Sequence, residues 1–239
     1  GDVVLSSRAR LARNIKGFPF VNRATEGVCN EILDLVKPVC DGETAVDTLE
    51  WVDLAAQDDP TRLMMVERHL VSSQLASAAL PAAVAVGSEL ARSIMVNEED
   101  HLRIQSIRPG LDFGAVHADV RALDDRLEQQ VSLAFHHRWG YLTACPTNLG
   151  TGARFSVMLH LPGLRITKEL ERVAKACRDT SMAIRGYRGE GSKTVADLYQ
   201  ISNQATLGRT EDDLCEQLSE QLLPGIIEYE RRARMLLIE

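Results

Sequence analysis

The residues of this sequence best suited to chemistry are arginines, glutamates and one cysteine, gathered in four short stretches of the chain. Arg8 and Arg10 stand two residues apart in a strand-like run, so their guanidinium groups are expected on one face of a sheet. Neighbouring guanidinium groups repel each other, and a bridging phosphate relieves that repulsion through bidentate hydrogen bonds. The alternative is that both arginines face water, because a motif this short often arises by chance.

The second stretch carries three consecutive acids, Glu98, Glu99 and Asp100, followed by Arg103. Acids alone in such a position are typical of a solvated hairpin turn. Here an apolar run enters the acids and another leaves them. Glu99 is therefore expected at the end of a rigid strand, a favourable place for a catalytic carboxylate.

The third stretch combines Cys145 with glycines at positions 150 and 152 and ends at Arg154. Glycines in such a loop can present backbone N–H groups to an anion. A lone cysteine at the end of an apolar run is commonly a buried hydrophobic residue. Close to arginines, however, its thiol pKa would fall, and the thiolate could accept a hydrogen bond from a cationic substrate.

The fourth stretch, residues 184–191, alternates glycines with Arg185 and other residues and contains Glu190. This pattern favours a lid that closes over a substrate, with an ordinary hairpin loop as the alternative. It is not G-x-G-x-x-G, and no G-x-x-x-x-G-K-[ST] occurs in the chain. Rossmann and P-loop nucleotide sites are therefore not predicted.

The elements that must position these residues are short strands and a few helices. Runs 93–97 and 102–107, and runs 141–145 and 154–161, are joined by short loops and are expected to pair antiparallel. Further strands are predicted at residues 3–11, 44–54, 84–86, 182–188 and 197–202. Helices are predicted over residues 26–36, over 113–137, after a Thr167 cap and after a Thr210 cap, with a kink at Pro224. The sequence thus predicts an α+β fold, an antiparallel β-sheet flanked by α-helices, in one domain over residues 1–239.

Composition narrows the class of protein. The 27 basic and 34 acidic residues give a net charge of −7, which disfavours direct nucleic-acid binding. The sequence has no apolar run of membrane-spanning length. Its five cysteines and six histidines lack metal-ligand spacing, so neither a disulfide framework nor a metal site is predicted, and a cytoplasmic location is expected. Because the chain starts at Gly1 and its last helix has no stop signal, it is expected to be a fragment of a longer chain.

Taken in order, four motifs resemble the catalytic domain of the phosphagen (guanidino) kinases: Ser-Ser-Arg-Ala-Arg, Asn-Glu-Glu-Asp-His-Leu-Arg, Cys-Pro-Thr-Asn-Leu-Gly-Thr-Gly-Ala-Arg and Arg-Gly-Tyr-Arg-Gly-Glu. The resemblance covers nearly the whole chain and implies a guanidino kinase or glutamine synthetase-like fold. It implies ATP, with Mg²⁺ held through the nucleotide phosphates. It also implies that Glu99 and Glu190 grip the acceptor guanidinium and that Cys145 lies beside it. Because the guanidinium must lose a proton, we assign Glu99 as the base and Glu190 as the clamp that closes with its loop. The implied nucleotide contacts are Ser7, Arg8, Arg10, His69, Arg103, Arg154 and Arg185.

The acceptor is the open question within that family. Residues 11–14, 140–144 and 198–204 look most like the bacterial branch that phosphorylates arginine in proteins, and only five residues precede Ser6. If the segment that precedes Ser6 is short, the guanidinium pocket is open on one side and can receive an arginine on a protein surface. This favours protein-bound arginine as the acceptor. Tyr187 and Arg188 look closer to kinases of free arginine, so free arginine is the alternative, and a catalytically dead adaptor that binds ATP or phosphoarginine is a third.

The resemblance also implies a cellular setting. It implies a role in stress response and protein quality control, with protein substrates that expose arginines. A heat-shock repressor and a Clp-type protease system are the implied partners, and a homodimer is compatible with the resemblance.

Overall fold

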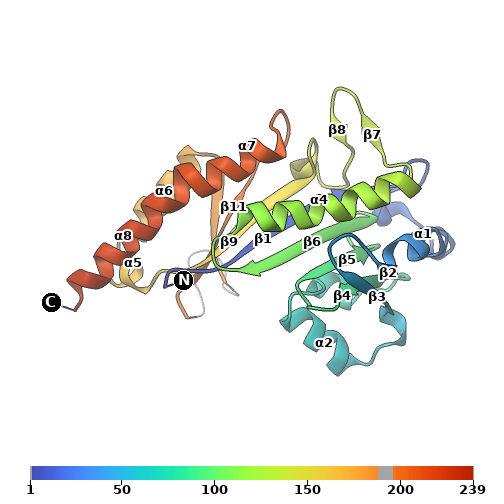
Figure 1. Cartoon of the computed structure of the whole chain (residues 1–239), viewed down its shortest axis with the longest axis horizontal. Helices are drawn as coiled ribbons and strands as arrows, with labels where there is room; N and C mark the ends of the chain where they lie inside the picture. Colours follow the sequence, from blue (N-terminus) through green and yellow to red (C-terminus); the bar gives the residue numbers. More distant parts are fainter. Residues whose placement is uncertain (1, 188–195, 239) are drawn as a thin grey trace. The chain divides into compact units, whose positions relative to one another are not determined.

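The computed structural model describes residues 2–187 and 196–238. In this part of the chain an antiparallel sheet has the strand order β10-β11-β9-β1-β6-β5-β4-β3-β2, and β7 pairs with β8 separately (Figure 1). The strands are β1 (Val4–Arg13), β2 (Gly42–Glu43), β3 (Thr48–Asp53), β4 (Ala83–Gly87), β5 (Arg92–Val96), β6 (Leu102–Pro109), β7 (Phe135–His136), β8 (Gly140–Tyr141), β9 (Ala153–His160), β10 (Met182–Gly186) and β11 (Leu198–Asn203).

Helices of very different length accompany the strands. The α-helices of the described residues are α1 (Glu26–Cys40), α2 (Asp59–Glu67), α3 (Ser73–Ala76), α4 (Phe113–Gln130), α5 (Pro162–Ile166), α6 (Leu170–Asp179), α7 (Glu211–Glu216) and α8 (Leu223–Leu236). None of them is both long and apolar enough to cross a bilayer.

The chain forms two compact units, and each is described by itself. Unit 1 consists of Gly1–Ala9, Ile107–Val116 and Arg154–Glu239, and unit 2 consists of Arg10–Ser106 and His117–Ala153. The strands β1 and β6 and the helix α4 contribute residues to both units. The single domain predicted over residues 1–239 stays a prediction.

In unit 1 the sheet has an apolar and a polar face. The strand register pairs Ser202 with Ser156 and Gln200 with Arg185, and paired residues project to the same side. Because side chains alternate along a strand, Arg154 projects to that side too. We call these five residues the polar face of unit 1. The intervening positions form a buried apolar layer: Phe155, Val157, Leu159, Tyr199 and Ile201.

The core of unit 2 lies between its short strands and helices. Helix α1 packs against β3, and α2 packs against α3. Burial of apolar side chains is the main stabilising contribution in such a layer. The central cluster consists of Leu54, Met65, Leu70, Val71, Leu75, Ala82, Val84, Val86 and Met95.

A buried arginine connects the elements of unit 2. The Arg13 guanidinium donates to both carboxylate oxygens of Asp124 on α4 and, through Nη1, to the carbonyl oxygen of Thr151 at 2.8 Å. The Tyr141 ring lies 3.6 Å from the guanidinium carbon. Arg13 is only 1 % exposed, and a buried charge is tolerated when it is paired in this way. Arg13 therefore fixes the loop before β9 against β1.

The predicted α+β fold is confirmed, but one of the two predicted strand pairings is wrong. Strands β5 and β6 pair antiparallel as expected. The run 141–145 does not pair with 154–161, because β8 ends at Tyr141 and β9 pairs with β11 instead. The chain after Tyr141 leads into a short 3₁₀ helix, Pro146–Asn148, and Pro146 has no N–H to donate to a strand ladder.

Three helix boundaries also differ from the prediction. The helix predicted over 26–36 continues to Cys40. The helix predicted over 113–137 ends at Gln130, because the amide of Ala134 bonds to Asn14 beyond β1 instead of continuing the helix. Helix α6 is preceded by Glu169, and Thr167 instead follows the end of α5, where its hydroxyl donates to the carbonyl oxygen of Gly163.

The start of the last helical region is confirmed. Thr210 caps α7 and forms a capping box with Asp213, an arrangement that satisfies two of the free amides at a helix start. A π-helical segment, Gln217–Leu222, then joins α7 to α8. Pro224 lies in the first turn of α8, where it removes no helical hydrogen bond.

A buried glutamate provides a stability prediction for unit 1. Glu230 is fully buried on α8, accepts from the amides of Gly163 and Leu164 at 2.9 Å, and accepts from Arg234 at 2.7 Å. The Glu230→Gln variant turns one acceptor into a donor, so we expect a loss of about 2 kcal/mol in unfolding free energy, or roughly 4–8 °C in Tm. The matched control, Glu228→Gln, breaks only an exposed pair with Arg232, and it should change Tm by about 2 °C or less. Equal Tm values for the two variants in calorimetry would refute this role of Glu230.

Candidate active site

The acidic turn of unit 2 is a rigid connection between β5 and β6. The amide of Asn97 donates to the carbonyl oxygen of His101 at 2.9 Å and closes the turn. Asn97 has a positive φ of 61°, a conformation that asparagine tolerates better than most residues. Its side-chain amide donates to the carbonyl oxygens of Cys29 and Pro81, both at 3.0 Å. The turn is thus held from two sides.

Glu99 projects from this turn and remains accessible. Its side chain is 39 % exposed, and its Oε2 lies 3.3 Å from Nη2 of Arg103. Burial raises the pKa of Glu99, with Asp100 and Glu98 acting in the same direction, while the charges of Arg103 and Arg10 oppose the rise. Glu99 is therefore an accessible carboxylate of raised proton affinity beside two cations.

Asp100, the next residue, brings the cysteine segment to the acidic turn. Its fully buried carboxylate accepts from the amide of Ala144 and from the side chain of Asn14, each at 2.6 Å. Ala144 directly precedes Cys145, so a single hydrogen bond joins the neighbours of Glu99 and Cys145. The Cys145 thiol is half-buried, with Thr147 Oγ1 at 3.0 Å.

His69 lies in the same unit, in a segment attached to the acidic turn. Its backbone has a positive φ of 59°, and its carbonyl oxygen accepts from the buried Gln105 at 2.6 Å. Three residues further on, Ser72 donates to Glu98 at 2.6 Å. Unit 2 therefore places Glu99, Arg103, Cys145 and the His69 segment around one turn, and the field of Arg10 acts on Glu99.

The glycines at 150 and 152 allow close packing of the loop against its neighbours. The amide of Gly150 donates to Tyr141, and the carbonyl oxygen of Gly152 accepts from Ala12. A Cβ on Gly152 would lie 2.6 Å from the carbonyl oxygen of Ala12 and 2.7 Å from Nη1 of Arg13. A side chain at position 152 would therefore push the loop away from β1.

In unit 1 the predicted phosphate contacts lie on or next to the polar face. Nη2 of Arg154 donates to Ser202 at 2.9 Å, and Gln200 donates to Ser156 at 2.9 Å. Arg185 is exposed opposite Gln200. Arg8 is half-buried on β1, the neighbour of β9, between two fully buried residues. Guanidinium groups match phosphate oxygens, and that of Arg154 is held in place by Ser202.

One predicted residue, Ser7, does not lie on this face. The buried Ser7 hydroxyl donates to the carbonyl oxygen of Gly110 at 2.8 Å and accepts from the amide of Asp112 at 3.0 Å. These residues lead into α4, whose Phe113 packs edge-on against Phe155 of the apolar layer, so Ser7 faces the side away from Arg8. Glu190 lies outside the described residues.

Sequence patterns alone did not indicate the supporting residues Asn14, Ser72, Glu98 and Asp100. Their partners lie far away in the chain: 86 residues separate Asn14 from Asp100, and 26 separate Ser72 from Glu98. A polar residue at the end of a strand was the available signal. It gave no indication of which carboxylate would be buried.

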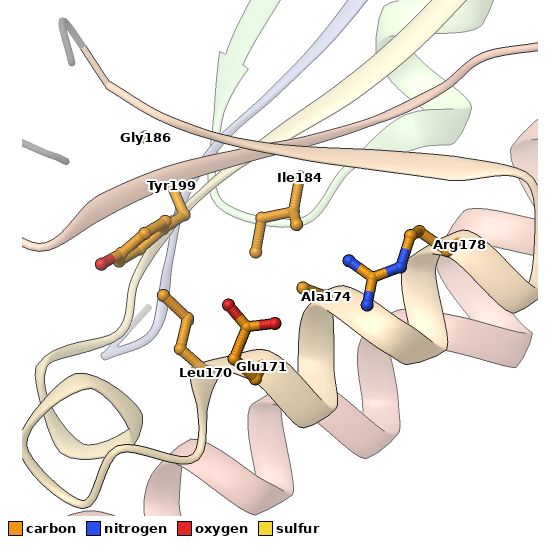
Figure 2. Close-up of a pocket in the computed structure, with 7 residues that line it drawn as sticks. All are labelled: Leu170, Glu171, Ala174, Arg178, Ile184, Gly186 and Tyr199. Carbon is orange, nitrogen blue, oxygen red and sulfur yellow. The ribbon is translucent and has the colours of Figure 1, made fainter. Parts of the chain in front are cut away.

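A separate pocket lies on the apolar side of unit 1. Figure 2 shows it between α6 and the strands β10 and β11, with the Glu171 carboxylate and the Arg178 guanidinium beside it. The cavity measures about 190 Å³. It is lined by Leu170, Glu171, Ala174, Arg178, Ile184, Gly186 and Tyr199, none of which is a predicted site residue.

Each unit, taken by itself, presents guanidinium groups that can pair with phosphate oxygens. They are those of Arg8, Arg154 and Arg185 in unit 1 and those of Arg10 and Arg103 in unit 2. Over residues 2–187 and 196–238, no group of three or more His, Cys, Asp and Glu side chains is arranged to hold a metal ion.

Comparison with known proteins defines the class. Residues 31–233 match the family described as ATP:guanido phosphotransferase, C-terminal catalytic domain. The structure is similar to the duplicated taurocyamine kinase from Schistosoma mansoni, with a TM-score of 0.87 and 25 % identity over 97 % of this chain and 33 % of that one. The chain therefore belongs to the ATP:guanido phosphotransferase family and is a phosphotransferase catalytic domain of that family.

Within this family the chain is similar to bacterial enzymes named protein-arginine kinase. The enzyme of Clostridium novyi is 44 % identical over 98 % of this chain and 68 % of its own length. The enzyme of Halothermothrix orenii is 42 % identical over 100 % of this chain and 68 % of its own length. The chain thus spans about two thirds of these relatives.

Proposed function

We propose that this chain transfers the γ-phosphate of ATP to arginine side chains of proteins. The observation that carries the proposal is its identity of 42–44 % to two protein-arginine kinases over nearly its whole length. The site geometry supports it, because an accessible carboxylate of raised proton affinity lies beside Arg103 in the same unit. The product is an N-phosphorylated arginine.

The chemistry of the acceptor explains the need for a carboxylate. An arginine guanidinium has a pKa of about 13.8 and delocalised nitrogen lone pairs, so it is a poor nucleophile until it is oriented and loses a proton. Glu99 accepts a hydrogen bond from the guanidinium and aligns its nitrogen with the γ-phosphorus. It takes the proton as the P–N bond forms and the bond from the γ-phosphorus to the β,γ-bridging oxygen breaks, so that ADP leaves. We assign the opposing clamp to Glu190, and we place Cys145 beside the guanidinium.

The nucleotide chemistry rests on the arginines. Phosphoryl transfer depends mainly on positioning and on neutralising the negative charge of the transferred group. Arg8, Arg10, Arg103, Arg154 and Arg185 supply fixed positive charge for the phosphates, and His69 is assigned to the nucleotide. Mg²⁺, carried on the phosphate oxygens, supplies further neutralisation when bound.

The proposal also covers the cellular setting. The substrates are proteins that expose arginines, in the stress response and protein quality control of a bacterial cytoplasm. A heat-shock repressor and a Clp-type protease system are the proposed partners, and a homodimer is the proposed assembly.

The acceptor is tested by competition. Wild-type protein is incubated with γ-labelled ATP and equal guanidinium concentrations of free arginine and an unfolded protein. We expect label in the protein and little in free arginine. Label mainly in free arginine would make the chain a free-arginine kinase, and ATP binding without any transfer would make it an adaptor.

The raised pKa of Glu99 predicts the pH dependence of the reaction. A base must be deprotonated, so kcat/KM falls as the pH drops through the pKa of Glu99, and this acid limb should lie above the ordinary range of a glutamate. Arg103 lowers the pKa of Glu99, so Arg103→Gln should move the limb to higher pH. The measurement is the pH profile of kcat/KM for the wild type and the variant. A limb that stays in place in Arg103→Gln would argue against Glu99 as the titrating group.

A further inference from the structure

The two neighbouring glutamates of the acidic turn are in different environments. The Glu98 side chain is 3 % exposed, whereas the Glu99 side chain is 39 % exposed. Both oxygens of Glu98 are already used. Oε1 accepts from Ser72 at 2.6 Å and from Nη1 of Arg103 at 2.7 Å, and Oε2 accepts from the amide of Glu99 at 2.9 Å.

This arrangement makes Glu98 unsuited to proton transfer and well suited to positioning. Three hydrogen bonds to its two oxygens hold this buried carboxylate in a single orientation. It orients one end of the Arg103 guanidinium, and the other end of the same group lies next to Glu99. It also fixes the backbone from which the Glu99 side chain projects. Groups held this closely lose little freedom in the transition state.

The contacts of Glu98 extend to the segment that carries His69. Ser72 uses one hydroxyl for two contacts: it donates to Glu98 and accepts from the amide of Leu75 at 3.0 Å, which caps α3. The same segment is held at its other end, where Gln105 donates to His69 and Ser93 donates to Leu70. The segment is thus attached to the turn at one end and to β5 and β6 at the other.

We propose that Glu98 is a positioning residue that holds Arg103, the Glu99 backbone and, through Ser72, the His69 segment in one geometry for the nucleotide. The inference rests on the proposed function, in which Arg103 and His69 contact ATP and Glu99 is the base. The two glutamates thus have different roles. Glu99 takes the proton, and Glu98 fixes the positions of Arg103 and of the Glu99 backbone.

The Glu98→Gln variant tests this role. A glutamine that keeps its oxygen towards Ser72 and Arg103 turns its amide group towards the N–H of Glu99, so two donors face each other. We expect the dissociation constant for Mg-ATP, measured by calorimetry, to rise about tenfold and kcat to fall about tenfold. The acid limb of the pH profile should persist and move to lower pH, because the charge of Glu98 raises the pKa of Glu99.

Variants of Ser72 separate the contact with Glu98 from helix capping. Ser72→Asp keeps an N-cap side chain for α3 but sets a second carboxylate against Glu98, so the dissociation constant for Mg-ATP should rise as in Glu98→Gln. Ser72→Thr keeps both contacts and should bind like the wild type. Ser73→Ala, at the exposed neighbouring serine, is the matched control and should also bind normally.

The outcomes distinguish this inference from the proposed function. Nucleotide affinity is measured without an acceptor, so a wrong acceptor leaves this test intact. Unchanged Mg-ATP affinity in Glu98→Gln and Ser72→Asp would overturn the positioning role. A loss of kcat in Glu98→Gln as large as in Glu99→Gln, with unchanged nucleotide affinity, would instead make Glu98 the base.

Discussion

Glu99→Gln should abolish most of the turnover and leave nucleotide binding nearly intact. The amide keeps the size of the carboxylate but cannot take the guanidinium proton, and acid-base catalysis is worth on the order of 10² to 10⁴ in rate. The Glu99 carboxylate is accessible and lies next to Nη2 of Arg103. Glu98 binds Nη1 of the same arginine, so Arg103 stays in place when Glu99 is replaced. The measurement is kcat by single-turnover transfer, with the Mg-ATP dissociation constant from calorimetry.

The control for Glu99 is a glutamate of the same unit outside the turn. Glu50 is exposed on β3, so Glu50→Gln removes an equal charge from unit 2 without touching the acidic turn. We expect normal turnover in that variant. Near-normal turnover in Glu99→Gln would remove Glu99 from the role of base and leave the chemistry to the arginines alone.

Arg154→Ala should produce the second large loss of turnover. The cause is the loss of a positive charge at the phosphate, and proton transfer is not affected. A single arginine that stabilises the transferred phosphoryl group can be worth about 10³ in rate. The side chain is anchored by Ser202 on the polar face of unit 1, so little reorganisation is needed when phosphate arrives. We expect kcat to fall about 10³-fold in steady-state assays of the alanine variant, with unfolding free energy nearly unchanged.

Arg154→Lys and Arg178→Ala are the matched variants for this prediction. Lysine keeps the charge but lacks the planar fork of donors, so it should recover only part of the rate. Arg178 is an exposed arginine of unit 1 beside the pocket on the apolar side, and its replacement by alanine should leave turnover unchanged. Unaltered kcat and KM in Arg154→Ala would take Arg154 out of the phosphate site.

Alternation along strands made part of the site predictable. The spacing of Arg8 and Arg10 indicates one face of β1, and their half-buried positions alternate with the buried Ser7, Ala9 and Leu11. The apolar runs on both sides of the acids likewise indicated the pairing of β5 with β6. These features depend on the alternation of side chains along a strand, with a period of two residues, and this alternation can be read from a single sequence.

The remaining features depend on contacts between distant residues. Burial of Glu98 requires Ser72 and Arg103 to converge on it, and no local pattern distinguishes it from Glu99. The early end of α4 depends on a hydrogen bond from Ala134 to Asn14, although the apolar spacing continues past Gln130. Tertiary contacts decide both cases, against what local propensity favours.

The bond formed in the product tests the central claim most directly. Wild-type protein is incubated with Mg-ATP and an unfolded protein acceptor, and the labelled acceptor is examined by ³¹P NMR and by its stability in acid. The account predicts a phosphorus–nitrogen bond on arginine that is labile in acid and forms on the order of 10² to 10⁴ times more slowly with Glu99→Gln. Phosphate in an acid-stable ester on serine, threonine or tyrosine, or no phosphate on the acceptor at all, would contradict it.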